Sequence, residues 1–398
     1  MSRPRDVYLH LLLVLALGMV LIEDVLGWSW LPLVFPATGV LFAASAAVMS
    51  GALDRARSAR VFYRRAGLRV LAPFWIVASV LLPVLLAQGW HADDTLGSGR
   101  LTVGTAWRWV LPLADPPVST GGLGAAAGVW LVRAILWFVL LTPPLLWIFR
   151  RWPVRLIVVP VGTLLLMTVG LVNLTGATAD IVTGLTTYVC CWLLGFGYRD
   201  GLLTRLPLGP TLAGGAAAVA AGLWCAGALR TQYEADSILD IPLASLLVST
   251  GAVLVLLRLQ PAFGWLARLR RSAAALRWIS RRTVSVVLWA GLTAAVAPTV
   301  LDRVVQPRID VPEAWFPLAE ALTAGVLLAL AVLLVGWIEA LLATPGPALS
   351  RARRLRRRLR RPVRHGLRAL RRPAVAGRTF VLEDNVVLEE APRSDVVP

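Results

Sequence analysis

Long apolar runs limit most strongly what this chain can fold into. An all-α fold follows from them, because a run of about 20 apolar residues spans a bilayer core of roughly 30 Å, and only helices or closed barrels satisfy their backbone there. We predict a polytopic membrane helix bundle of about ten transmembrane helices. The expected spans are 8–26, 30–50, 68–90, 125–149, 155–173, 179–198, 208–229, 239–258, 279–301 and 316–344.

The composition agrees with a membrane protein and excludes an ordinary soluble one. The chain of 398 residues is 58% hydrophobic and only 16% charged, whereas soluble domains carry about 25% charged residues. Its net charge of +18 comes from 40 basic residues, all of them arginine. We do not expect a nucleic-acid partner from this charge, because the arginines occupy short segments between apolar runs and a C-terminal tail.

The distribution of arginine predicts the orientation. With the N-terminus inside, the inner segments before the tail (1–7, 51–69, 150–155, 199–205 and 258–282) hold 20 arginines, and the outer loops hold 5. Cytoplasmic loops carry such an excess. We therefore expect cytoplasmic N- and C-termini and a multi-pass protein of the bacterial inner (plasma) membrane.

Cysteine and histidine are too sparse for a disulfide framework or a metal site. Cys190, Cys191 and Cys225 all lie within apolar runs and are interpreted as small apolar residues. The three histidines are His10, His91 and His365, so a site with two or three histidine ligands is not expected. We predict no metal ligands and no bound cofactor.

The tail divides into a basic and an acidic part. We place a transmembrane domain at 1–345, a basic amphipathic cytoplasmic helix at 346–378 and a disordered acidic segment at 379–398. Residues 351–372 contain 12 arginines together with a stripe of apolar residues at helical spacing. Such a helix is typical of the surface of an anionic leaflet, so Arg351–Arg372 predict an interaction with inner-leaflet lipids.

Charged residues inside the spans are candidate functional groups, because they are costly in a bilayer. Glu23 and Asp24 lie at the outer end of the first span, and Arg133 lies at comparable depth in the fourth. They could form an ion pair between two helices, whose role would be structural or functional. Basic clusters flank the inner ends of the second, third, eighth and ninth spans, and the stretch 60–69 is one of them. They either anchor the topology or form a cytoplasmic site for a phosphorylated donor, since arginine binds phosphate with two hydrogen bonds.

Several stretches in this order resemble the acyltransferase 3 family of bacterial membrane O-acyltransferases. The resemblance covers roughly residues 5–344. The stretches are Arg5–Leu9, Gly27–Pro36, Met49–Arg55, Phe62–Trp75, Trp130–Phe138, Trp192–Gly201 and Ile279–Arg282.

The resemblance implies transfer of an acyl group from acyl-CoA, held on the cytoplasmic side, to a hydroxyl of a cell-envelope carbohydrate, lipid or metabolite. It also implies a basic residue, ten others and then a histidine in the first span, where the histidine acts as general base. Here Leu13 and Asp24 occupy those two positions, and Ala290 stands where relatives often have a further histidine.

The candidate site residues follow from both lines of reasoning. Asp24 and Glu23 are the predicted catalytic groups. The predicted substrate-binding residues are Arg133, Trp130, Arg64, Arg65 and Arg69.

Three functions remain open at this point. The chain is an acyltransferase in which Asp24 replaces the usual base, or a catalytically silent relative that acts as a membrane scaffold or lipid-binding protein. The third function is a transporter of a lipid or an acylated sugar.

Overall fold

The computed structural model describes residues 4–26, 30–87, 102–119, 122, 124–126, 128–233, 235, 237–259, 270–308, 312 and 315–343. These residues belong to one compact unit, residues 1–343. The predicted basic helix 346–378 and acidic segment 379–398 lie outside the described residues.

Every regular element in the described part of the chain is a helix. The long helices are α1 (Pro4–Leu26), α3 (Ala37–Asp54), α4 (Ala59–Ala87), α6 (Val129–Arg151), α7 (Pro153–Thr168), α8 (Gly176–Arg199), α10 (Leu208–Leu229), α11 (Pro242–Leu259), α13 (Arg270–Ser280), α14 (Thr283–Val300) and α15 (Phe316–Ala343). Short turns of helix lie between them: α2 (Leu31–Val34), α5 (Val103–Ala106), η1 (Trp107–Trp109), α9 (Leu202–Arg205), η3 (Ile238–Asp240) and η4 (Leu301–Val305).

The predicted polytopic helix bundle is confirmed. In the described residues, eight helices are long and apolar enough to cross a membrane, and the first and fifth predicted spans correspond to shorter apolar stretches, Val7–Glu23 and Pro153–Thr168. The main difference lies in α4, which begins at Ala59 rather than near residue 68. The basic stretch 60–69 is therefore the first part of this helix, because arginine is a good helix former. The cytoplasmic position of the termini stays a prediction.

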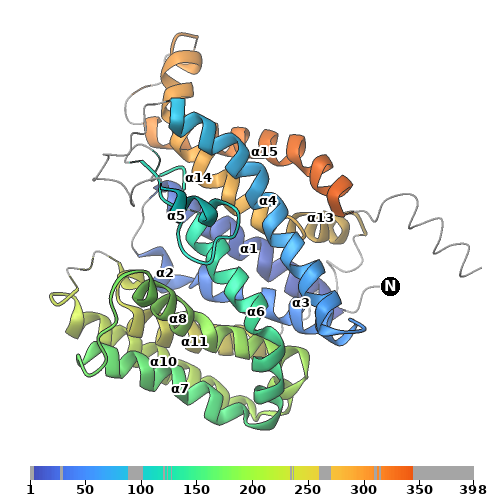
Figure 1. Cartoon of the computed structure of the whole chain (residues 1–398). Coiled ribbons are helices and arrows are strands. Elements are labelled where there is room, and N and C mark those ends of the chain that lie inside the picture. Colours follow the sequence, from blue (N-terminus) through green and yellow to red (C-terminus); the bar gives the residue numbers. More distant parts are fainter. Residues whose placement is uncertain are drawn as a thin grey trace, which may run out of the picture. The chain divides into compact units, whose positions relative to one another are not determined.

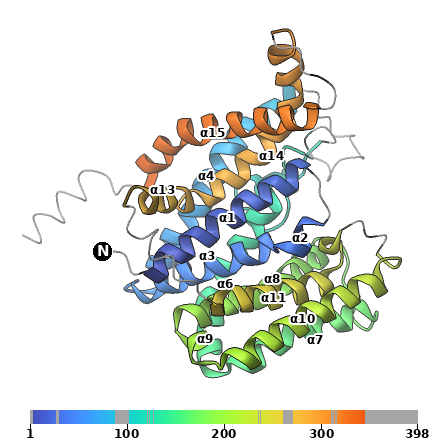
Figure 2. The ribbon, with the colours of Figure 1, turned by 180° about the vertical axis from the view of Figure 1, so that it is seen from behind.

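Two groups of helices make up the bundle, as Figures 1 and 2 show. Helices α7, α8, α10 and α11 pack side by side. Helices α1, α4, α13, α14 and α15 lie together in the other group. Helix α3 packs against both α1 and α8, and α6 contacts both α4 and α8, so these two helices join the groups.

Aromatic rings fill the core where α3, α6 and α8 meet. Phe138 stacks on Trp192 with ring centroids 4.7 Å apart. Phe42 stacks on Tyr188 at 5.0 Å and meets the edge of Phe138 at 5.2 Å. The cysteines are free, and Cys190 and Cys191 are fully buried. They pack as small apolar residues, as expected.

Glycine allows α3 and α8 to approach closely. A Cβ atom on Gly195 would lie 2.1 Å from the backbone oxygen of Ala43, far inside contact distance. Helix α10 meets α11 in the same way, since a Cβ on Gly215 would lie 3.0 Å from the oxygen of Gly251. Small residues at helix contacts are typical of membrane bundles.

A side chain of α4 donates a hydrogen bond to a backbone carbonyl of α6 that a proline leaves without its helical partner. Pro144 has no N–H, so the carbonyl of Leu140, four residues earlier, lacks its helical donor. The hydroxyl of Tyr63 donates to this carbonyl at 3.0 Å. An unpaired carbonyl is costly within a membrane, so Tyr63 both stabilises the interrupted helix and fixes α4 beside it.

Candidate functional site: an arginine-lined cavity

A cavity of about 420 Å³ opens at the end of the bundle where α3 and α8 end and α14 begins. Side chains from α1, α3, α4, α6, α8, α13 and α14 line it. Its walls therefore come from segments that are far apart in the sequence. We call it the arginine cavity, after the residues described next.

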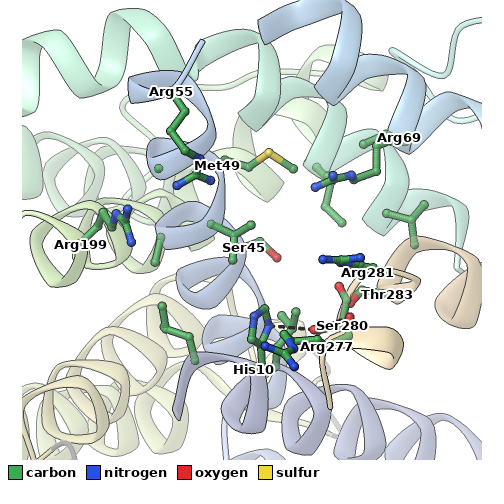
Figure 3. A pocket seen from close by; sticks show the side chains of 18 residues that line it. His10, Ser45, Met49, Arg55, Arg69, Arg199, Arg277, Ser280, Arg281 and Thr283 are labelled. Carbon is green, nitrogen blue, oxygen red and sulfur yellow. Dashed lines mark hydrogen bonds between the residues drawn. The ribbon is translucent and has the colours of Figure 1, made fainter. Parts of the chain in front are cut away.

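Five arginines line the cavity: Arg55, Arg69, Arg199, Arg277 and Arg281. Figure 3 shows them arranged around it, with Arg55 and Arg199 on the side of α3 and α8 and with Arg69 and Arg281 opposite. They come from three of the segments that the arginine bias assigns to the inner side. None of the 18 described residues that line the cavity is Asp or Glu. The wall is thus strongly positive and suits an anionic ligand.

His10 is the histidine in the cavity wall, and its ring nitrogen Nδ1 lies 2.8 Å from the hydroxyl oxygen of Ser280 (Figure 3). The Ser280 hydroxyl also donates to the carbonyl of Leu276 at 2.7 Å. Because that hydroxyl proton is engaged, the geometry favours Nδ1–H as the donor to Ser280, which leaves the lone pair of the neutral ring on Nε2. The contact also fixes α13 against α1.

Apolar side chains complete the wall. They include Leu9, Leu13, Val70 and Ile135. Leu13 occupies the position at which the family resemblance expects a basic residue, so that substitution faces the cavity itself. Arg277 of α13 and Arg281 in the turn before α14 supply positive charge to the same cavity.

The predicted substrate-binding residues separate into three groups. Arg69 lines the cavity, whereas Arg64 and Arg65 are exposed on α4 and are not among the residues that line it. Arg133 and Trp130 lie near the start of α6 and are not among the residues that line the cavity, although Ile135 of the same helix is. The structure therefore brings only Arg69 of this set to the cavity.

Arg133 has a different partner from the one considered above. It is 8% exposed and forms an ion pair with Asp115, in the segment that precedes α6. Burial raises the pKa of the Asp115 carboxyl above its usual value, and the charge of Arg133 opposes that rise. The adjoining segment is held by Trp75 and Trp137, whose indole N–H groups donate to the carbonyls of Val110 and Leu113.

The predicted catalytic carboxylates lie toward the far end of α1. Glu23 is half-buried, and the side chain of Asp24 lies outside the described part of the structure. Asp24 follows His10 by 14 residues, which corresponds to about 21 Å along a helix at 1.5 Å per residue. Leu13, the cavity-lining residue of α1 nearest to Asp24 in the sequence, precedes it by 11 residues or about 17 Å. Asp24 therefore lies well beyond the α1 residues that line the cavity, and its catalytic role stays a prediction.

A comparison with protein families supplies the next observation. The model of the acyltransferase 3 family, described as an acyltransferase domain, matches residues 7–340. The chain belongs to the acyltransferase 3 family. The match includes all five arginines of the cavity and the ten apolar stretches described above. No curated protein and no solved structure matches the chain.

Sequence reasoning predicted part of this site. Arg55, Arg69, Arg277 and Arg281 belong to the basic clusters at the inner span ends for which an anion site is one prediction. Arg199 belongs only to the arginine bias and to the family resemblance, and His10 was counted only in excluding a metal site. One signal was present: these arginines all lie within a few residues of the expected inner helix ends. Which of them face a common cavity depends on tertiary packing.

Proposed function

We propose that this member of the acyltransferase 3 family transfers an acyl group from a phosphate-bearing thioester, such as acyl-CoA, to a hydroxyl acceptor. The observation that carries the proposal is the arginine cavity, which places five guanidinium groups around about 420 Å³ without a described carboxylate in its lining. A donor with several phosphates complements that charge.

Arginine suits this ligand better than a simple excess of charge would. Its planar guanidinium donates two parallel hydrogen bonds to phosphate oxygens and stays charged at every physiological pH. The phosphates would occupy the arginine cavity, and the acyl thioester would extend along α1 into the bundle. The apolar residues Leu13, Val70 and Ile135 suit the less polar arm of such a donor.

The reaction needs a base at the acceptor. The hydroxyl oxygen attacks the thioester carbonyl, its proton passes to the base, the C–S bond breaks, and CoA leaves as the thiol after taking up a proton. Asp24 is the predicted base, with Glu23 beside it. The roughly 21 Å between His10 and Asp24 along the helix requires an extended donor, and it would place the reaction near the end of the bundle that holds Arg133.

The proposed setting is the bacterial plasma membrane, with the arginine cavity open to the cytoplasm where acyl-CoA is made. The acceptor would then be a hydroxyl of an envelope carbohydrate, a lipid or a metabolite. The positive-inside bias supports this orientation.

Release of free CoA tests the proposal. Purified protein is incubated with acetyl-CoA and candidate hydroxyl acceptors, and CoA thiol is measured with and without acceptor. Acceptor-dependent release that is lost in Asp24→Ala supports the enzyme. Binding of CoA without any release supports the silent scaffold, and counterflow of a labelled lipid in proteoliposomes without acyl transfer supports the transporter.

A further inference from the structure

We infer that Arg150, which does not line the arginine cavity, sets its selectivity for anions by holding two carboxylates away from two of its arginines. This positioning role rests on the proposed function, because it concerns the same anion site. The carboxylates are Asp54 and Asp200, and the arginines next to them in the sequence are Arg55 and Arg199.

Arg150 lies at the end of α6 and binds both carboxylates. Its Nε and Nη2 atoms donate to the two carboxylate oxygens of Asp200 at 2.9 and 3.0 Å. Its Nη1 and Nη2 atoms donate to the two oxygens of Asp54 at 3.2 and 3.3 Å. One guanidinium thereby joins the ends of α3, α6 and α8.

The local sequence makes this arrangement specific. Asp54 is the last residue of α3 and Arg55 follows it, whereas Arg199 is the last residue of α8 and Asp200 follows it. Neighbouring residues on a helix point in different directions. In both pairs the arginine lines the cavity and the carboxylate turns to Arg150.

Both carboxylates lie where a helix disfavours them. The C-terminus of a helix carries a partial negative charge, so an acidic group there is repelled. Two acids at two neighbouring C-termini need a cation, and Arg150 supplies it. Without Arg150, the nearest cations available to Asp54 and Asp200 would include the cavity arginines beside them.

A close contact fixes Arg199 in its position. Gly51 lines the cavity, and a Cβ atom there would lie 3.1 Å from the Cζ atom of Arg199. The guanidinium of Arg199 therefore lies over a glycine of α3, one turn before Asp54. Freeing Asp54 would add a carboxylate near this group and weaken its attraction for an anionic ligand.

Titration of CoA into the full-length protein in detergent tests the inference, with Arg150→Met as the main variant. We expect CoA affinity to fall about tenfold, the equivalent of one charge-assisted hydrogen bond. The triple variant Arg150→Met, Asp54→Asn, Asp200→Asn should return to within about twofold of the wild-type affinity, because the competing charges are gone. Arg151→Met is the matched control, since Arg151 is an exposed neighbour, and it should bind CoA as the wild type does.

Recovery of CoA affinity in the triple variant distinguishes two roles of Arg150. In one, Arg150 holds the carboxylates away from the cavity arginines; in the other, it only joins the ends of the three helices. A tie between helix ends would be lost in both variants, so weak binding in the triple variant would overturn the inference, as would unchanged binding in Arg150→Met. Inorganic pyrophosphate is the second probe. Wild-type protein that binds pyrophosphate but not CoA contradicts the proposed donor, and the same variants then test the inference with pyrophosphate. Binding of neither probe overturns both proposals.

Discussion

At the residue scale, the charge of the arginine cavity depends on where each acidic group is held. Five arginines line the cavity, while Asp54 and Asp200 bind Arg150 outside its wall. At the other end of α6, Asp115 pairs with Arg133. Asp115, Asp54 and Asp200 thus pair with arginines that do not line the cavity.

The predicted base can be tested without disturbing the cavity. Asp24→Asn removes the carboxylate and keeps the size of the side chain. We expect the rate of acyl transfer to fall about 10²–10⁴-fold, as for loss of a general base. CoA affinity should stay unchanged, because Asp24 is about 21 Å along α1 from His10. Rates of CoA release and a CoA titration on the same preparation measure both effects.

Glu23→Gln is the matched control for that substitution, and we expect a smaller effect on the rate. Full activity in Asp24→Asn would contradict the assigned role of this residue. The search for a base would then move to His10, the histidine in the cavity wall beside Ser280.

Sequence reasoning reached some of these residues and not others, for a physical reason. The apolar runs and the arginine bias are local properties of the sequence, so the spans could be predicted from the order of residues without knowledge of how the helices pack. The convergence of Arg55, Arg199 and Arg281 on one cavity depends on how α3, α8 and α14 pack, which a single sequence does not show. The pairing of Arg133 with Asp115 was missed for the same reason, because the sequence alone does not show that the segment before α6 packs against that helix.

At the element scale, close helix contacts and a hydrogen bond between α4 and α6 stabilise the bundle. Membrane helices gain little from apolar burial against lipid, so tight packing and hydrogen bonds between helices carry more of the stability. Gly195 in the contact of α3 with α8 and Tyr63 in the contact of α4 with α6 represent these two kinds of interaction.

Gly195→Ala should destabilise the protein by about 1–3 kcal/mol, the usual cost of adding atoms to a packed contact. The new Cβ would lie 2.1 Å from the oxygen of Ala43. Gly214→Ala in α10 is the control, because nothing lies within 4 Å of the added atom, and alanine is the better helix former. Thermal unfolding in detergent should show a lower midpoint for Gly195→Ala alone, and equal midpoints would contradict the packing described.

Tyr63→Phe removes the hydroxyl that donates to Leu140 and leaves the ring in place. We expect the free energy of unfolding to fall by about 0.5–1.5 kcal/mol, typical of one hydrogen bond. The reason is that the carbonyl of Leu140, which Pro144 leaves without a helical donor, also loses the Tyr63 hydroxyl. The measurement is again the unfolding midpoint in detergent. A midpoint equal to that of the wild type would show that this hydrogen bond does not support α6.

At the scale of the whole molecule, the bundle has two chemically different ends. The end with the arginine cavity also holds Arg150 and its two carboxylates. The other end holds the pair of Arg133 and Asp115 and the start of α6. A donor that enters at the arginine end and an acceptor that reaches the opposite end would meet within the bundle, which fits transfer of an acyl group across the membrane.

Labelling of introduced cysteines measures the orientation. In a background without Cys190, Cys191 and Cys225, Ser58→Cys places a thiol on the exposed turn between α3 and α4, and Asn173→Cys places one on the exposed turn between α7 and α8. With an impermeant maleimide on intact cells, we expect Asn173→Cys to react and Ser58→Cys to react only after permeabilisation. The reverse pattern would place the arginine cavity outside the cytoplasm and contradict the proposed supply of acyl-CoA.

The affinity of the arginine cavity for CoA tests the central claim most directly. Arg69 and Arg64 lie on the same helix, but only Arg69 lines the cavity. Titration of CoA into detergent-purified protein should show saturable binding that weakens about tenfold in Arg69→Ala, through loss of a charge-assisted contact, and stays unchanged in Arg64→Ala. Equal affinity in wild type and Arg69→Ala, or no binding at all, would contradict the account.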